Sequence, residues 1–247
     1  MTSALGGNEL PSLISAVLGR QWKPSAKGFT SWLDWWSFKI EGQRLSLVLG
    51  EIGRSDDVLA SRIFRKSKTF VSSKLWPTLD VIVHHQKELV KKGNLLSPVH
   101  RKILEIVESE GSTRTDRLRK TVGLEGKENT SKFHRSLVDL ENYSLIIGSE
   151  DPKPEKHLHA NIWQTWEKRT GKISRRGNRS YPQAVEDLLE DAIDTSVLAD
   201  ERQIRKWFSW SNDTEAAVKE LLRKNVITRV DSHVLKRETI EVLSNVR

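Results

Sequence analysis

The chain has 247 residues, of which 36% are hydrophobic and 30% are charged, and its formal net charge is +8. We expect an ordinary soluble, folded protein from this composition, not a disordered chain. The absence of cysteine excludes disulfides and thiolate metal ligands. No apolar run approaches the roughly 18 to 20 residues needed to cross a bilayer, so no membrane contact is expected.

The positive charge is unevenly distributed. Residues 1–97 carry a net charge of +6 and residues 98–180 one of +5, whereas residues 181–247 carry −3. A polyanion such as nucleic acid is therefore expected to be attracted to the first two segments and weakly repelled by the third.

Residues 1–96 are predicted to form a mostly helical, tryptophan-rich, basic domain. Helices are expected over residues 10–18 and 77–91, with an apolar segment around residues 45–52 between them. The acidic pair Asp56-Asp57 is expected to cap a further helix after that segment. The stretch that follows is rich in cations around aromatic and apolar residues, and these are Arg62, Arg65, Lys66, Lys68 and Lys74.

Residues 97–167 have the pattern of a winged helix. Ser97-Pro98 is a typical helix start and predicts a first helix to about residue 109. A second helix is expected over residues 115–122 and a third over residues 128–142, followed by a strand at 145–147. The polar stretch 149–160 has the composition of a β-hairpin wing, with a return strand at 162–163 and Trp166 packed behind it.

The same order of elements recurs in residues 181–247. Residues 118–122 are echoed by residues 204–208, and the apolar positions around 103–107 and 189–193 precede them at the same offset. Further matches in spacing and apolar character pair Leu137, Leu140, Leu145 and Ile146 with Val218, Leu221, Val226 and Ile227. The second copy is expected to end in a return strand at 234–235 and a short helix at 238–247. The predicted fold class is therefore mainly α with small β-wings (α+β), arranged as tandem winged-helix domains.

A basic linker is predicted between the two copies, over residues 168–180. It has two glycines and no acidic residue, and its cations are Lys168, Arg169, Lys172, Arg175, Arg176 and Arg179. Both this linker and the basic stretch 62–74 are suited to contact phosphates, although surface lysines and arginines also serve solubility alone.

The third helix of the first copy is the natural recognition helix. Its apolar face is used by Phe133, Leu137 and Leu140, so polar side chains near its N-terminal half are expected to point outward. Such side chains suit base edges and phosphates in a major groove, and the alternative is a solvated helix face. The candidate DNA-binding residues of this helix are Lys127, Asn129, Ser131, Lys132 and Arg135.

Evidence for catalysis or cofactors in the sequence is slight. Trp32, Trp35 and Trp36 have the helical spacing of core residues, although tryptophans also stack on extruded bases. Asp34 lies among them and is the single candidate for a catalytic carboxylate, but it suits a helix cap equally well. His157 and His159 fall short of a metal site, so we expect no metal and no cofactor.

Three stretches of the sequence are characteristic in combination: Ser97-Pro98 before a helix, GKENTSKFHRSL at 126–137, and LII at 145–147. In these the chain resembles a known family, the AlkZ/YcaQ-related tandem winged-helix proteins. The sequences WLDWW at 32–36 and RKSKTF at 65–70 resemble the N-terminal region of the same family. The similarity extends over most of the chain, and its most specific part is the stretch 126–137.

This resemblance implies monofunctional DNA glycosylase activity on alkylated or cross-linked bases, with wings that grip duplex DNA and no metal. The catalytic signature of the family is Gln-x-Gln or Gln-x-Asp, in which polar side chains position the attacking water. None of the six glutamines of this chain is followed two residues later by Gln or Asp.

Three hypotheses about function follow from the sequence. The first is a DNA-binding tandem winged-helix protein related to DNA glycosylases and acting in repair, with duplex DNA as its partner. The second is an active glycosylase that uses another water-positioning group. The third is a transcription regulator or scaffold in which residues 181–247 dock a protein partner. In each case the N-terminus lacks a secretory signal, so a cytoplasmic, nucleoid-associated location is expected.

Overall fold

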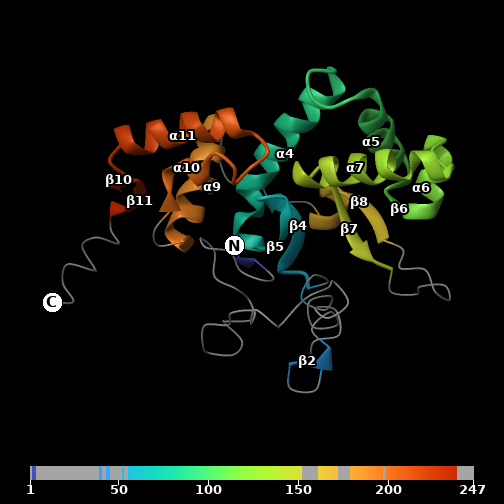
Figure 1. Ribbon diagram of the computed structural model, residues 1–247, viewed down its shortest axis with the longest axis horizontal. Helices are drawn as coiled ribbons and strands as arrows, with labels where there is room; N and C mark the ends of the chain where they lie inside the picture. The colour runs from blue at the N-terminus through green and yellow to red at the C-terminus, as the bar shows by residue number, and fades with distance from the viewer. Residues whose placement is uncertain are drawn as a thin grey trace.

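The structure is a computed structural model, and it describes residues 2–3, 39–40, 43–44, 52, 55–151, 161–171, 179–196 and 199–237. The described part is mostly helical with small antiparallel sheets, which confirms the predicted α+β class (Figure 1). The expected helices at 10–18 and 238–247, residues 45–51 of the expected apolar segment and the tryptophans at 32–36 lie outside the described residues.

The basic stretch forms a β-hairpin. Strand β4 (Val58–Phe64) pairs antiparallel with β5 (Ser67–Ser72), and the short strand β1 (Thr2–Ser3) pairs with β5. A separate pair is formed by β2 (Lys39–Ile40) and β3 (Gln43–Arg44). The helix expected after Asp56-Asp57 is therefore wrong. Val58, Ile63 and Phe64 favour a strand, and the burial of side chains along β4 is near-alternating. The Asp57 carbonyl accepts a hydrogen bond from Ser73 N at 2.8 Å, which closes the base of the hairpin.

A 3₁₀ turn, η1 (Ser73–Leu75), leads into helix α4 (Trp76–Lys91), one residue longer than predicted. The buried side of α4 includes Leu79, Ile82, Val83 and Val90, and it packs against helix α9 of the second copy. The hairpin and α4 therefore lie between the two copies of the repeat (Figure 1).

The first copy has the predicted helices at nearly the predicted bounds. They are α5 (Pro98–Glu110), α6 (Thr115–Val122), the 3₁₀ turn η2 (Lys127–Asn129) and α7 (Thr130–Asn142). Gly123 ends α6 in the left-handed conformation, with φ of 81°, which explains why the helix stops there. Strand β7 (Ile146–Glu150) and strand β8 (Asn161–Thr165) follow, then the short helix α8 (Trp166–Thr170) with Trp166 fully buried.

A strand of three residues that the pattern did not reveal, β6 (Ser112–Arg114), completes the sheet of the first copy. The sheet order is β6-β8-β7, and all pairs are antiparallel. Residues 152–160, where the wing is expected, lie outside the described part of the chain.

The second copy repeats this order of elements. Helix α9 (Tyr181–Ser196) is followed by β9 (Ala199–Asp200), α10 (Glu201–Ile204), α11 (Ser211–Arg223), β10 (Ile227–Val230) and β11 (His233–Lys236). Its sheet order, β10-β11-β9, corresponds strand for strand to that of the first copy. The main difference is that α10 has 4 residues where α6 has 8.

The matched positions of the repeat form the core. Leu118 and Ile204 are fully buried, as are Ile103 and Leu189 at the same offset, and Leu140 and Leu221 are at most 2% exposed. The buried side chains of both copies belong to one hydrophobic cluster, which also takes in Phe64 from the hairpin. Burial of apolar side chains stabilises small domains. The apolar positions that match in the sequence are therefore positions at which both copies pack their cores.

The first residues of the predicted linker lie in a helix. Lys168 and Arg169 lie in α8, and the Arg169 guanidinium donates to the backbone carbonyls of Ser55 and Val58 at 3.0 and 2.9 Å. Arg169 thus ties the first copy to the start of β4. Residues 172–178, which include most of the linker, lie outside the described residues.

Candidate nucleic-acid interface

Helix α7 presents a polar face to solvent. Phe133, Leu137 and Leu140 are at most 2% exposed and fix the helix against the core of the first copy. This packing leaves Lys127, Ser131, Lys132 and Arg135 exposed and Asn129 half-buried. His134 is exposed on the same helix, although the sequence analysis did not include it among the candidates.

The turn that leads into α7 is held by one arginine. The Arg119 guanidinium donates to the carbonyls of Leu124 and Gly126 and to the hydroxyl of Thr130, all at 2.7 Å. From its charge alone Arg119 would be a candidate for phosphate contact, but its guanidinium already donates these three hydrogen bonds within the protein. It therefore fixes where α7 begins, and so where the exposed cations of α7 lie.

The cations of α7 and of its counterpart α11 differ in their partners. On α11, Lys219 pairs with Glu215 at 3.1 Å and Arg223 pairs with Glu220 at 2.6 Å. The hydrogen bond from Arg223 lowers the pKa of Glu220 to about 2. Within the described ranges, no ion pair involves Lys127, Lys132 or Arg135 of the first copy.

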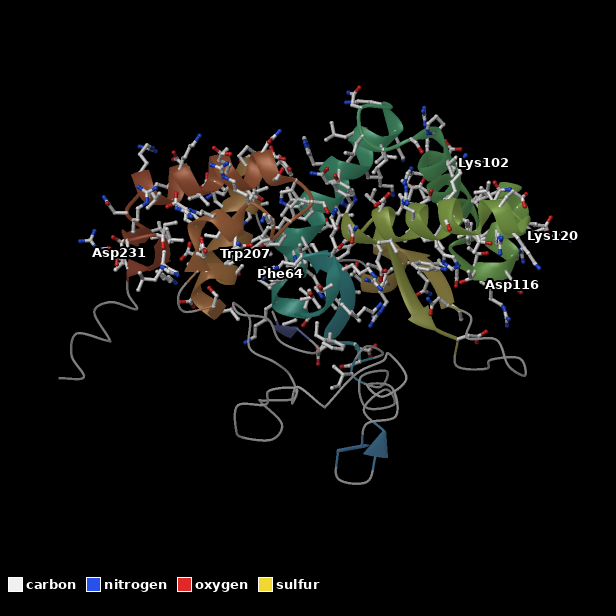
Figure 2. All side chains as sticks on the ribbon, in the orientation of Figure 1. Phe64, Lys102, Asp116, Lys120, Trp207 and Asp231 are labelled. Carbon is white, nitrogen blue, oxygen red and sulfur yellow. The ribbon has the colours of Figure 1, made fainter. Side chains whose placement is uncertain are left out.

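The short hairpin β10–β11 is a second respect in which the second copy has fewer available cations than the first. Val230 pairs with His233, so the hairpin has a two-residue loop of Asp231 and Ser232, and the exposed Asp231 lies at the end of the molecule opposite Lys120 (Figure 2). Arg229, beside the loop, is already bound by both carboxylate oxygens of Glu201 at 2.7 Å. A short acidic loop of this kind is poorly suited to approach phosphates.

Two of the predicted DNA contacts in the basic hairpin are bound within the protein. Arg62 Nε and Lys68 Nζ lie 3.0 and 3.1 Å from the carboxylate oxygens of Glu141, whose side chain is 4% exposed. Glu141 belongs to the C-terminal end of α7, so these ion pairs attach the hairpin to α7. Each cation is still about 40% exposed, at 38% for Arg62 and 42% for Lys68. The remaining candidates of this stretch, Arg65 and Lys66, form the exposed turn of the hairpin.

The stem of the expected wing is rigidly built. The ring of Trp163 covers Gly148 on the paired strand, and its indole N–H donates to the Thr115 hydroxyl at 2.9 Å. Thr115 also donates to the Asn161 carbonyl at 3.0 Å, at the point where β8 begins. On the other strand, Arg114 binds the Asp151 carboxylate at 2.8 Å. The start of α6 thus fixes both sides of the stem.

Several predicted site residues cannot be compared with the structure because they lie outside the described residues. These are Asp34, Lys172, Arg175 and Arg176, together with the tryptophans at 32–36 and the two histidines at 157 and 159. In the part of the chain that the structure covers, no three His, Asp or Glu side chains form a group suited to a metal ion. No helix in that part is long and apolar enough to span a membrane.

The sequence analysis did not find the structural roles of Arg119, Glu141 and Thr115. Arg119 and Arg205 occupy the same position of the repeat, but only the first is followed by a longer turn before the third helix. That insertion was the available signal, because a longer turn needs donors to satisfy its carbonyls. No comparable signal exists for Glu141, whose cations lie more than 70 residues away in sequence.

Comparison with known proteins identifies the family. The family described as AlkZ related matches residues 13–209. The chain belongs to this family. The predicted resemblance is thereby confirmed over most of the chain, including the stretch 126–137 on which it chiefly rested.

The structural comparison agrees with this assignment. The DNA glycosylase AlkZ of Streptomyces sahachiroi matches with a TM-score of 0.52 and 13% sequence identity, over 81% of this chain and 57% of AlkZ. At this identity the likeness shows a shared fold, and the present chain spans little more than half of the Streptomyces protein. No curated protein matches the sequence.

Proposed function

We propose that this AlkZ-related chain binds duplex DNA through the first copy of its repeat and acts in DNA repair. Both copies have the order of helices and strands of a winged helix, in which the third helix enters the major groove. The similarity to a protein named as a DNA glycosylase supports repair as the process. Because the Gln-x-Gln or Gln-x-Asp signature is absent from the sequence, DNA binding is the proposed activity rather than base excision.

The observation that supports this proposal best is the difference in ion pairing between α7 and α11. A lysine or arginine that already pairs with a carboxylate must give up that partner before it binds a phosphate. Lys219 and Arg223 of α11 are in that situation. In the described structure Lys132 and Arg135 of α7 have no such partner, so a phosphate can bind them at no cost in ion pairs.

The exposed residues of α7 have distinct proposed roles. Lys132 and Arg135 are three residues apart and therefore lie on one side of the helix, where they reach phosphates and base edges. Lys127, Asn129 and Ser131 surround the start of the helix and are suited to contact the backbone of one strand. The second copy, with its paired cations and acidic loop, braces the fold in this proposal and is the part available to a protein partner.

The experiment is a fluorescence-anisotropy titration of labelled duplex DNA at several salt concentrations. We expect Lys132→Gln with Arg135→Gln to lower the affinity at least tenfold. The slope of log K against log salt should become shallower by about 1.8, that is, about 0.9 for each lost phosphate contact.

The matched control is Lys219→Gln with Arg223→Gln on α11, which removes the same charge from the equivalent helix. We expect this variant to keep the affinity within about twofold, because its cations are neutralised by Glu215 and Glu220. Equal losses in the two variants would show that net charge, rather than α7, drives binding. A wild-type chain that binds no duplex at low salt would overturn the proposed function.

A further inference from the structure

Two carboxylates of the first copy have ion-pair spacing from the exposed cations of α7. Glu128 comes four residues before Lys132, and Asp139 comes four residues after Arg135. Side chains four residues apart on a helix are neighbours, and opposite charges at this spacing attract each other. On α11 a glutamate and a lysine at the same spacing pair at 3.1 Å. In the described structure neither pair forms on α7, so each carboxylate is directed elsewhere.

The carboxylate of Asp139 is held by a histidine of α5. His100 Nε2 lies 3.3 Å from Asp139 Oδ2, and His100 is buried. The other ring nitrogen, Nδ1, accepts a hydrogen bond from Ser97 N at 3.2 Å. The proton of the neutral ring is therefore on Nε2, where it points to Asp139. This tautomer gives Asp139 a hydrogen-bond donor outside α7.

The carboxylate of Glu128 lies over the turn that precedes α7. Its Oε1 accepts a hydrogen bond from the side-chain amide of Asn129 at 3.1 Å. The atoms nearest a Cβ built on Gly126 all belong to Glu128, so the side chain folds back toward the start of the turn. This contact is local, whereas that of Asp139 joins two helices and uses a buried ring. Asp139 is therefore the more firmly placed of the two carboxylates.

The second copy has other residues at both positions of the α5–α7 contact. In the register of the repeat, His100 corresponds to Glu186 and Asp139 corresponds to Glu220. Glu220 binds an arginine and a lysine of its own helix at 2.6 and 3.5 Å, and this lysine also binds Glu186. The carboxylate of α11 thus neutralises cations of α11. In the first copy the histidine removes the matching carboxylate from that use.

We propose that His100 is a positioning residue for DNA binding, which holds Asp139 and so leaves Arg135 available to a phosphate. The inference rests on the proposed function, because the availability of Arg135 matters only if Arg135 contacts DNA. An ion pair within a helix is weaker when the cation comes first in sequence, as Arg135 does here. A single hydrogen bond from His100 therefore suffices to keep Asp139 from Arg135.

The test variant is His100→Gln. A glutamine three residues after Ser97 accepts from Ser97 N–H as His100 does, so the capping box of α5 is kept while the donor to Asp139 is lost. We expect the affinity for duplex DNA at low salt to fall about threefold, because Asp139 then pairs with Arg135. This loss should shrink as salt is added, since salt screens an exposed ion pair. A displaced α7 would instead weaken binding equally at every salt concentration, which would contradict the proposal.

A double-mutant cycle by fluorescence anisotropy separates ion pairing from general effects of charge. Arg135→Gln should lower the affinity of the wild type more than that of His100→Gln, in which Arg135 is already neutralised. Asp139→Asn should raise the affinity of His100→Gln at least to the wild-type level, and this recovery also shows that the variant is folded. The same change in the wild type is the matched control, and we expect it to have a smaller effect.

The failure of this inference is distinct from the failure of the proposed function. If Arg135→Gln has equal effects in both backgrounds, or if Asp139→Asn does not restore binding, His100 does not set the availability of Arg135. Should Arg135→Gln still weaken the wild type in that case, the proposed function of α7 stands without this inference.

Discussion

At Gly148 the pair of strands β7 and β8 has no space for a side chain. A Cβ atom built on this residue would lie 2.7 and 2.9 Å from two ring carbons of Trp163. Gly148 is needed for this close approach, which lets the indole N–H reach Thr115 while the ring closes the sheet. The Gly148 carbonyl also accepts a hydrogen bond from Lys68 at 3.3 Å, so one residue contacts both the stem and the basic hairpin.

We expect Gly148→Ala to destabilise the fold by about 1 to 3 kcal/mol, the usual cost of forcing extra volume into a packed site. Chemical denaturation of the full chain measures this change in the free energy of unfolding. Gly126→Ala is the matched control, since the three atoms nearest its Cβ all belong to the flexible, exposed side chain of Glu128. Equal stabilities of the two variants would mean that the Trp163 ring moves aside freely.

Among the elements, the turn between α6 and α7 distinguishes the two copies most clearly. In the first copy Arg119 satisfies three acceptors around a turn that the second copy lacks. The corresponding Arg205 instead forms a surface ion pair with Glu215 at 3.4 Å and is 63% exposed. The same residue type at the same position of the repeat thus stabilises the start of α7 in one copy and forms a surface ion pair with α11 in the other.

This difference predicts unequal effects of the same substitution. Arg119→Gln should lower the free energy of unfolding by about 2 kcal/mol, because hydrogen bonds from a charged donor to three acceptors are lost. Arg205→Gln should change it by less than about 0.5 kcal/mol, as is usual for an exposed ion pair. Urea denaturation of both variants compares them directly, and a larger loss for Arg205→Gln would contradict the role assigned to Arg119.

On the scale of the whole molecule, helix α4 connects the two copies. On one side Lys87 lies 2.6 Å from Glu108 of α5 and 2.7 Å from Glu167 of α8. On the other side Gln86 donates to the Tyr181 hydroxyl at 2.9 Å, and that hydroxyl donates to Asp213 of the second copy at 2.7 Å. Polar contacts therefore join α4 to both copies, in addition to the shared hydrophobic core.

These contacts predict how stability depends on pH. Burial acts to raise the pKa of Glu167. The hydrogen bond and charge of Lys87, a backbone hydrogen bond and the Thr165 hydroxyl together outweigh burial, so the pKa of Glu167 is lowered. The contribution of Glu167 to the free energy of unfolding is therefore complete above the ordinary glutamate pKa. This contribution is lost as the pH falls through the lowered pKa that Glu167 has in the folded state. Burial lowers the pKa of Lys87, yet the hydrogen bonds to Glu108 and Glu167 raise it overall.

Thermal unfolding of the wild type and of Glu167→Gln across acidic pH measures this effect. The wild type should be more stable at neutral pH, by no more than about 1 kcal/mol because Glu167 is partly exposed. The difference should vanish as the pH falls below the range in which Glu167 titrates. A difference that stays constant from neutral to strongly acidic pH would show that ionisation of Glu167 contributes nothing.

The parts of the fold that could be predicted are those that depend on interactions between residues close together in the sequence. The bounds of α4, α5 and α6 were predictable because helical spacing, Ser97-Pro98 and Gly123 are all local signals. The β4–β5 hairpin was missed because its turn is Arg65-Lys66, which carries no turn signal. Strands of two or three residues, such as β6 and β9, are too short to show any periodicity.

The candidate site shows the same division. The outward direction of Lys132 and Arg135 follows from the apolar spacing of α7 itself. In contrast, the predicted DNA contacts Arg62 and Lys68 are paired with Glu141, and only the tertiary structure brings these residues together. A count of charges along the sequence cannot distinguish a cation that is available from one that is already bound.

The buried carboxylate of Glu141 has a practical consequence for dissecting the protein into fragments. A fragment that begins at residue 97, where the repeat begins in the sequence, would contain Glu141 but neither Arg62 nor Lys68. Helix α7 of this fragment would then carry, near its C-terminal end, a carboxylate without the two cations that pair with it in the full chain. We therefore expect a fragment that keeps the ion pairs of Glu141 to need the β4–β5 hairpin as well as the elements of the first copy.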